Sequence, residues 1–213
     1  MSQPRRRSRS VRVILLVLLA LGVLVLGAVI AVLVPILTHQ SAGGSGQEIS
    51  DELVPEVSAV GADDRTRVLS VETPDGKPAD VGDLTPGEVL DVSGSGFDAG
   101  IGIYVAICAI PESAEEKPSP CLGGIPSGAE DGDAAGDTAL SSVWITDDWA
   151  WRAFATQGYA DAKTGSFTAR ITVPDPQMEG LDCRVTRCAI ATRADHTASS
   201  DRIQDILLPV AFH

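Results

Sequence analysis

Two patterns of hydrophobic and polar positions divide the chain. Residues 13–37, VILLVLLALGVLVLGAVIAVLVPIL, carry no charged side chain. From Val68 onward the apolar runs are short, and turn signals rich in Gly, Pro and Asp separate them. A long apolar run predicts a helix that can cross a membrane, whereas short runs at this spacing predict an all-β sandwich or barrel.

The apolar run at 13–37 is long enough to be a retained transmembrane helix. At a rise of about 1.5 Å per residue it crosses a hydrocarbon core of about 30 Å with some tilt. A cleaved secretory signal is the alternative, but its apolar stretch is usually only about 7–15 residues long. A twin-arginine signal is disfavoured because the span is long and very apolar.

Charge is distributed unevenly around this helix. Residues 1–12 contain five arginines and no acid, which predicts a cytoplasmic basic tail. The rest of the chain then has 11 basic and 29 acidic residues, a net charge of −18. We therefore expect a single-pass plasma-membrane protein with an extracytoplasmic C-terminal domain. Such an acidic surface repels nucleic acid, so nucleic-acid binding is excluded from the expected functions.

Residues 38–67 are rich in Gly, Ser and acidic side chains, in the stretch THQSAGGSGQEISDELVPEVSAVGADDRTR. Little of this stretch can be buried, so its composition predicts a flexible extracytoplasmic linker. The folded domain is expected over residues 68–213.

Strict alternation within that domain predicts which side chains face its core. The run IGIYVAICAI places Ile101, Ile103, Val105 and Ile107 on one face, and the run SFTARITV places Phe167, Ala169, Ile171 and Val173 inward. Pro209, within DILLPVAF, predicts an edge strand or a bulge, because proline cannot donate to a β-ladder.

An acidic stretch at 122–160 interrupts this rhythm. Across residues 111–160, the first half is expected to be disordered, while SSVWI and WRAFAT are expected to pair or pack. All three tryptophans, Trp144, Trp149 and Trp151, lie here, which makes them candidate contacts for a protein partner or a ligand. The alternative is that they form a lid that completes the core. The neighbouring Asp147 and Asp148 argue against insertion into an anionic membrane surface.

The four cysteines, Cys108, Cys121, Cys183 and Cys188, all lie in the exported part. An even number of cysteines in an oxidising compartment predicts disulfides, for which three pairings are open. Zinc binding is disfavoured because the spacings do not match the usual short zinc-ligand spacing and no histidine accompanies the first two cysteines.

Two stretches resemble catalytic or metal-binding loops only in part. His196 lies near serines and aspartates in RADHTASSDR, but a triad is defined by convergent geometry, and no G-x-S-x-G motif is present. Residues 131–137, DGDAAGD, match a calcium loop incompletely, since Ala135 and Ser142 occupy ligand positions. We expect no catalytic residue, no metal and no cofactor. The loop after Cys188 is instead expected to be held by charge-assisted hydrogen bonds among Arg193, Asp195, Arg202 and Asp205.

Several of these segments together resemble the neocarzinostatin family. The resemblance rests on LDVSGSGFDAG, YVAICA, DAKTGSFTARITV, DCRVTRCAI and LLPVAF. It covers about residues 68–213, with 122–160 as an insertion that the family pattern lacks. It implies an immunoglobulin-like β-sandwich of about seven strands with two local disulfides, Cys108–Cys121 and Cys183–Cys188. Known members hold an enediyne in a cleft, but the cleft-lining residues have no recognisable counterpart here, so the resemblance implies the fold and not the ligand.

The expected function is therefore a non-catalytic binding or interaction module of the cell envelope, anchored through residues 13–37. The leading form binds a protein partner, as an accessory subunit of a larger membrane complex. The alternatives are a carrier of a small apolar ligand in the sandwich cleft and, least favoured, an envelope hydrolase that uses His196.

Overall fold

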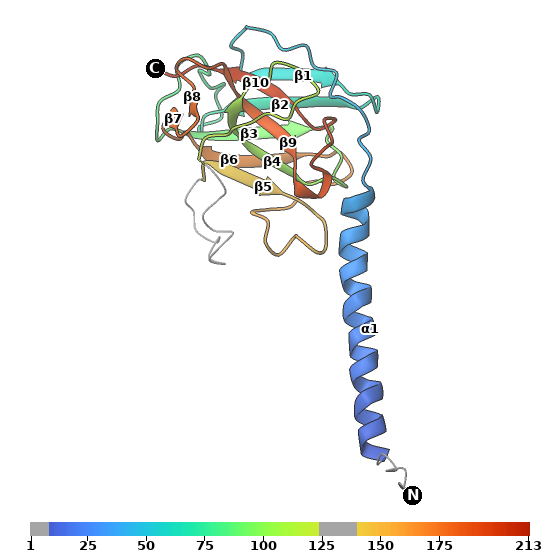
Figure 1. Ribbon diagram of the computed structural model, residues 1–213. Helices are drawn as coiled ribbons and strands as arrows, with labels where there is room; N and C mark the ends of the chain where they lie inside the picture. The colour runs from blue at the N-terminus through green and yellow to red at the C-terminus, as the bar shows by residue number, and fades with distance from the viewer. Residues whose placement is uncertain (1–8, 124–139) are drawn as a thin grey trace, which may run out of the picture. The chain divides into compact units, whose positions relative to one another are not determined.

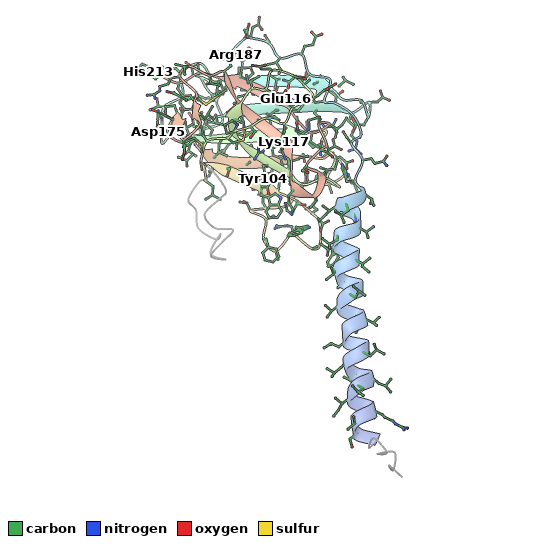
Figure 2. All side chains as sticks on the ribbon, in the orientation of Figure 1. Tyr104, Glu116, Lys117, Asp175, Arg187 and His213 are labelled. Atoms are coloured by element: carbon green, nitrogen blue, oxygen red, sulfur yellow. A yellow bond between two sulfur atoms is a disulfide. The ribbon has the colours of Figure 1, made fainter. Side chains whose placement is uncertain are left out.

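The computed structural model describes residues 9–123 and 140–213, which form two separate compact units. The first unit is dominated by helix α1, Arg9–Thr38 (Figure 1). Its apolar side chains project all along the helix and are solvent-exposed (Figure 2). Within the described residues, α1 is the one helix long and apolar enough to cross a membrane, as the sequence predicted.

The second unit, residues 40–213, is a β-sandwich of two four-stranded antiparallel sheets (Figure 1). One sheet has the order β1 (Glu56–Val60), β2 (Thr66–Glu72), β3 (Val89–Ser95), β6 (Phe167–Thr172). The other has the order β10 (Leu207–Val210), β9 (Cys188–Ala194), β4 (Ile103–Ala109), β5 (Ser142–Ile145). A small hairpin joins β7 (Gln177–Met178) to β8 (Leu181–Asp182). This arrangement confirms the predicted all-β sandwich.

The predicted alternation places the core correctly except at Ile101, which is only half-buried and lies outside the core cluster. In β4, Ile103, Val105 and Ile107 are completely buried between the sheets. In β6, Phe167, Ala169 and Ile171 are buried, while the side chains between them are exposed. β10 is an edge strand, as Pro209 predicted, because it pairs only with β9 within its sheet.

The second sheet is also covered on its outward face. The outward-facing side chains of β4, β9 and β10 form a second buried cluster, Ala106, Cys108, Ala189, Ala191 and Leu207. Ile49, Ile110 and Cys121 pack against this cluster from outside. The cover therefore comes from the chain before β1 and from the segment that follows β4.

The prediction of a flexible linker over residues 38–67 was wrong. Residues from Gln40 belong to the compact domain, and β1 pairs with β2 along its whole length. Val57 and Ala59 supply the apolar side chains that pack on the core. Composition missed this because the preceding residues, which are mostly polar, are held by hydrogen bonds to the domain rather than by buried apolar area.

Part of the predicted insertion is regular structure. β5 lies within 122–160 and pairs with β4, and the main chain of Gln157 bonds to Trp144 and Thr146 on the other side of β5. SSVWI also packs against WRAFAT, as expected, because the amide of Trp144 donates to the hydroxyl of Thr156 at 3.2 Å and the rings of Trp144 and Trp151 lie 6.5 Å apart. Residues 111–123, where disorder was expected, are instead held by the Cys108–Cys121 disulfide and by main-chain hydrogen bonds. The rest of the stretch expected to be disordered and the calcium-like loop at 131–137 lie outside the described residues.

Both disulfides have the pairing that the family resemblance implied. Cys108 on β4 is bonded to Cys121, and Cys183 after β8 is bonded to Cys188 at the start of β9. The first bond closes the disulfide loop, residues 109–120, on the outward side of the second sheet. The second fixes the small hairpin to the sandwich. These bonds occupy all four cysteines and so exclude the zinc alternative.

Candidate functional site: an aromatic loop and a covered sheet face

Trp144 is built into the edge of the second sheet. It lies on β5 directly opposite Tyr104 on β4, with ring centroids 5.7 Å apart. Only 8% of its surface is exposed. Of the three tryptophans, Trp144 therefore fits the lid alternative best, because it extends the buried surface of the sheet rather than facing solvent.

A buried carboxylate fixes the indole of Trp144. Its Nε1 donates to Oδ2 of Asp195, which is completely buried, at 2.9 Å. The other carboxylate oxygen accepts from the main chain and the hydroxyl of Thr197, so Asp195 caps the single turn η1, His196–Ala198. Position 102 has room only for a glycine, because a Cβ there would lie 2.0 Å from Oδ2 of Asp195, the oxygen that accepts from Trp144. The site thus depends on three separate segments of the chain.

His196 stacks against this aromatic group. Its ring meets Trp151 edge-on with centroids 4.5 Å apart, and it lies 5.3 Å from Trp144. Asp195, its neighbour, uses both oxygens to hold Trp144 and Thr197. These contacts give His196 and Asp195 a structural role, so the geometry supplies no support for the hydrolase alternative.

The segment that carries the other tryptophans is an ordered turn, which we call the aromatic loop, residues 147–158. Asp148 holds it, since its carboxylate accepts from the amide of Ala150 at 2.8 Å and its carbonyl accepts from the amide of Arg152 at 2.7 Å. Asp147 accepts from the amide of Tyr159 at the other end of the loop. Asp147 and Asp148, which the sequence analysis took as arguing against membrane insertion, therefore also shape the turn.

Two aromatic side chains of the aromatic loop face solvent. Trp149 is 73% exposed and Phe154 is 61% exposed. The ring of Trp151 lies 6.5 Å from Phe154 and 6.5 Å from Trp144. The structure thus brings Trp144 and Trp151 together but leaves Trp149 apart. Sequence reasoning missed Phe154, whose exposure has no signature in WRAFAT.

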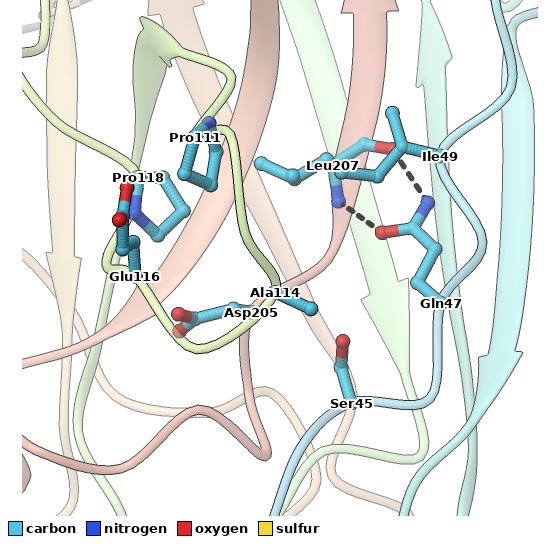
Figure 3. A pocket seen from close by; sticks show the side chains of 9 residues that line it. All are labelled: Ser45, Gln47, Ile49, Pro111, Ala114, Glu116, Pro118, Asp205 and Leu207. Carbon is cyan, nitrogen blue, oxygen red and sulfur yellow. Dashed lines mark hydrogen bonds between the residues drawn. The ribbon is translucent and has the colours of Figure 1, made fainter.

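A small pocket lies on the outward face of the second sheet (Figure 3). Ser45, Gln47 and Ile49 line it on one side, residues of the disulfide loop line it on the other, and Asp205 and Leu207 form its floor. Its volume is about 20 Å³, which suits roughly one water molecule. A site for a drug-sized ligand usually needs about 300–1,000 Å³. No tryptophan lines this pocket.

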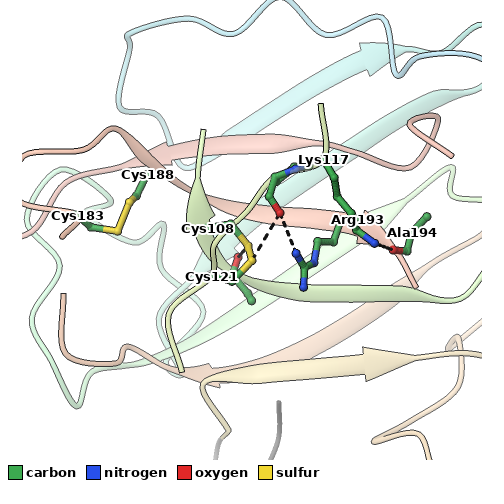
Figure 4. Close-up of a disulfide and its surroundings, with 9 residues drawn as sticks. Cys108, Lys117, Cys121, Cys183, Cys188, Arg193 and Ala194 are labelled. Atoms are coloured by element: carbon green, nitrogen blue, oxygen red, sulfur yellow. Dashed lines mark hydrogen bonds between the residues drawn. A yellow bond between two sulfur atoms is a disulfide. The ribbon is translucent and has the colours of Figure 1, made fainter. Parts of the chain in front are cut away.

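Cations hold the disulfide loop against β9. Lys117 Nζ donates to the carbonyl of Ala194 at 2.7 Å, and Arg193 Nη1 donates to the carbonyl of Pro118 at 2.9 Å (Figure 4). Burial, together with the nearby charge of Arg193, lowers the pKa of Lys117 to about 8. Sequence reasoning missed Lys117 because its partner is a main-chain oxygen far along the chain.

The predicted charge-assisted network after β9 is only partly as expected. Arg202 Nη1 donates to the carboxylate of Asp205 at 2.7 Å, and both side chains are buried. Burial raises the pKa of Asp205 to about 6, against the opposing effect of Arg202. Arg193 instead contacts Pro118 and the ring of Tyr104. Among residues 9–123 and 140–213, no cluster of His, Cys, Asp and Glu is arranged to hold a metal ion.

Comparison with known proteins gives one family and one related structure. The family model described as the neocarzinostatin family matches residues 77–204. The solved structure of macromomycin is similar with a TM-score of 0.36 at 17% sequence identity, covering 68% of this chain and 99% of that chain. No curated protein matches the chain.

Proposed function

Because this chain belongs to the neocarzinostatin family, we propose that its domain, residues 40–213, is a non-catalytic binding module held at a membrane by α1. The matched residues 77–204 lie wholly within this domain. We further propose that the domain is extracytoplasmic, with the basic residues before α1 in the cytoplasm. Two disulfides and the charge difference across α1 support this orientation.

The partner that we propose is another protein of the envelope, bound through the aromatic loop. The observation that carries this proposal is the exposure of Trp149 and Phe154 on a turn that hydrogen bonds hold in shape. Large aromatic side chains dominate the energy of protein interfaces, and a rigid presentation lowers the entropy lost on binding. Trp151 and His196 support the loop from beneath.

The pocket described on the outward face of the second sheet does not by itself support the carrier alternative. The pocket on the second sheet has a volume of about 20 Å³, and the buried Trp144 offers no open ring face to a ligand. Exposed aromatic side chains on a convex turn instead suit a macromolecular surface, which can surround them on binding.

The experiment compares variants of the full-length protein purified in mild detergent from its native membrane. A Trp149→Ala, Phe154→Ala double variant should lose a stoichiometric protein partner that the wild type retains. Val185→Ala is the matched control, because Val185 is 84% exposed on a different loop and should leave the partner bound. Each truncation of an anchoring aromatic side chain is expected to weaken binding by about 2 kcal/mol.

Three results would refute this proposal. They are retention of the partner by the double variant, an equal loss of the partner in Val185→Ala, and absence of the partner from the wild type. Mass spectrometry of the purified material also detects a co-purifying small molecule, which would support the carrier alternative instead.

A further inference from the structure

Four strands form the outer edges of the two sheets, β1 and β6 in the first sheet and β5 and β10 in the second. An uncovered edge offers unpaired amide and carbonyl groups to any other strand, so folded proteins usually cover or blunt it. How each of these edges is covered therefore indicates where a further chain can pair with the domain.

The edge of β10 is covered by a side chain. Gln47 Nε2 donates to the carbonyl of Leu207 at 2.6 Å, and its Oε1 accepts from the amide of Leu207 at 2.7 Å (Figure 3). Pro209, further along β10, has no amide hydrogen. This edge therefore has few groups left for another strand.

Gln157 covers parts of two further edges. Its amide donates to the carbonyl of Trp144 on β5. Its side-chain Nε2 donates to the carbonyl of Thr168 on β6 at 2.9 Å. Further along β6, the amide of Thr172 donates to the carbonyl of Leu140. The main-chain groups at the edges of β5 and β6 are therefore engaged by the chain itself.

β1 differs from these three strands because one side of it faces no other strand. It lies at the outer edge of the first sheet and pairs only with β2 (Figure 1). Hydrogen-bonded pairs alternate along an antiparallel ladder, and the amide of Gly61 bonds to the carbonyl of Arg65 in register with the β1–β2 ladder. Odd-numbered residues of β1 therefore bond to β2, and the amides and carbonyls of Glu56 and Ser58 point away from it.

The outward main-chain groups of Glu56 and Ser58 have no hydrogen-bond partner in the part of the chain that the structure describes. The side chains of both residues are also exposed. The next outward position, Val60, is obstructed, because Gly46 lies so near that a Cβ on it would be 2.1 Å from the carbonyl oxygen of Val60. Residues 56–58, which we call the open edge, are thus a short and well-defined place for strand pairing.

We propose that the open edge pairs with the open edge of a second copy of this chain, antiparallel about a two-fold axis, so that two four-stranded sheets join into one. Glu56 of each copy then lies opposite Ser58 of the other, and Val57 lies on the axis. Two such pairs form, and each exchanges two main-chain hydrogen bonds. Because the same surface serves both copies and the other edges are covered, assembly stops at a dimer.

Charge and space select this register. An axis at Glu56 would set two carboxylates directly opposite each other, and like charges in that position are destabilising. An axis at Ser58 would set Glu56 of the second copy beside Val60, where Gly46 lies. An axis at Val57 avoids both conflicts.

A second copy is the occupant that the membrane anchor makes available. The contact is small, since a standard interface has about 20–30 residues on each side, so a freely diffusing partner would bind it weakly. Copies held at a membrane by α1, as proposed above, are confined near one another, which raises their effective concentration. The dimer therefore rests on the proposed anchoring, but it does not involve the aromatic loop.

The first experiment tests the register by disulfide crosslinking of the full-length protein in liposomes. All four native cysteines are in disulfides, so an introduced cysteine is the one free thiol. Differently tagged Glu56→Cys and Ser58→Cys copies, mixed and oxidised, should give a covalent dimer, because a hydrogen-bonded pair brings the Cα atoms to about 5.5 Å. Ser95→Cys, which is exposed at the end of β3, is the matched control and should not crosslink to Glu56→Cys.

The second experiment removes one outward amide without altering the β1–β2 ladder. Ser58→Pro deletes the amide hydrogen on the solvent side, which an edge strand tolerates, whereas Ser58→Ala keeps it. Energy transfer between copies labelled through Val185→Cys, at a position 84% exposed, measures association as a function of surface density. Ser58→Pro should weaken association roughly tenfold or more, because each dimer loses two hydrogen bonds. Ser58→Ala should match the wild type.

Two further variants separate strand pairing from other causes. Glu56→Pro removes the other outward amide and should give the same loss as Ser58→Pro, so the result does not depend on the folding of one variant. The Trp149→Ala, Phe154→Ala double variant should associate as the wild type does. Hydrogen exchange across β3 must stay at its wild-type level, which confirms that each variant has kept its core.

Contrary results overturn the dimer in distinct ways. Wild-type copies without energy transfer above random proximity at any density do not associate, which leaves the open edge to an extended segment of another protein. Wild-type association in both proline variants, or an equal loss in Ser58→Ala, means that main-chain pairing does not join the copies. Absence of the crosslink between positions 56 and 58 contradicts the register. Protein that fails to insert into liposomes contradicts the anchoring on which the dimer rests.

Discussion

The indole Nε1 of Trp144 and the buried carboxylate of Asp195 are joined by a hydrogen bond of 2.9 Å. This bond links the edge strand β5 to the turn η1 and supports the aromatic loop through His196. Trp144→Phe should keep the ring but leave Oδ2 of Asp195 without its donor. We expect the free energy of unfolding to fall by about 2 kcal/mol, measured by urea unfolding.

The matched control for this prediction is Trp149→Phe. Trp149 is 73% exposed, so the same chemical change there should alter the free energy of unfolding by no more than about 0.5 kcal/mol. Equal losses in the two variants would show that the hydrogen bond to Asp195 does not stabilise the domain.

Gly102 is the second position on which this contact depends. A Cβ at this residue would lie 2.0 Å from Oδ2 of Asp195, so Gly102→Ala must displace the carboxylate or the main chain of β4. We expect a loss of about 2 kcal/mol or more in the free energy of unfolding, together with a changed tryptophan fluorescence spectrum. Gly44→Ala, where a Cβ meets no atom closer than 4.0 Å, should leave both measurements close to those of the wild type.

The two disulfides should differ in their contribution to stability. The Cys108–Cys121 bond spans a sequence separation of 13, and the Cys183–Cys188 bond spans 5. In the chain-entropy model these loops contribute about 3 and about 2 kcal/mol, respectively. Paired Cys→Ala variants, compared by urea unfolding, should reproduce that order. The reverse order would mean that native packing around the hairpin, rather than loop length, determines the contribution.

Asp205 should give the domain a specific pH dependence. Burial raises its pKa to about 6 in the folded domain, from the ordinary value of 3.8. The folded state therefore binds this proton more tightly than the unfolded state does, and the resulting stabilisation is complete below pH 3.8 and lost as the pH rises through about 6. Asp205→Asn should remove this dependence, so the stability difference between wild type and variant should change across that window.

Asp63 provides a contrast with the opposite sign. The hydrogen bond from Arg67 lowers its pKa from 3.8 to about 2, so its stabilisation is present above pH 3.8 and lost as the pH falls through about 2. Urea unfolding across pH 2–8 should show that the stability difference between wild type and Asp63→Asn changes at a lower pH than the difference between wild type and Asp205→Asn. If both differences changed over the same pH range, the opposite pKa shifts of Asp63 and Asp205 would be contradicted.

The sequence predicted those parts of the fold that depend on side-chain alternation. Ile103, Val105 and Ile107 are buried as the period of two required, because a slip by one residue would turn the whole set outward. The sequence did not predict the contact in which a polar side chain takes the place of a β-strand. Gln47 pairs with the main chain of Leu207 as a strand would, and no composition rule for linkers contains such a contact.

The candidate site was predictable in residue type but not in role. The concentration of tryptophans predicted a contact surface in this region, and the structure shows that Trp144 is buried whereas Trp149 is exposed. The burial of Trp144 depends on Asp195, which is 51 residues away in the sequence and holds the indole by a hydrogen bond. Long-range partners of this kind are set by the tertiary fold, which local pattern does not encode.

The outer edge of β10 has a consequence for molecules confined side by side in a membrane. Open strand edges let like chains join into continuous sheets, and crowding in two dimensions makes such encounters frequent. Here Gln47 occupies both main-chain groups of Leu207, and Pro209 has no amide hydrogen to offer. A neighbouring copy thus finds almost nothing to pair with on this edge, so a domain held at a membrane by α1, as we propose, can reach a high surface density without polymerising there.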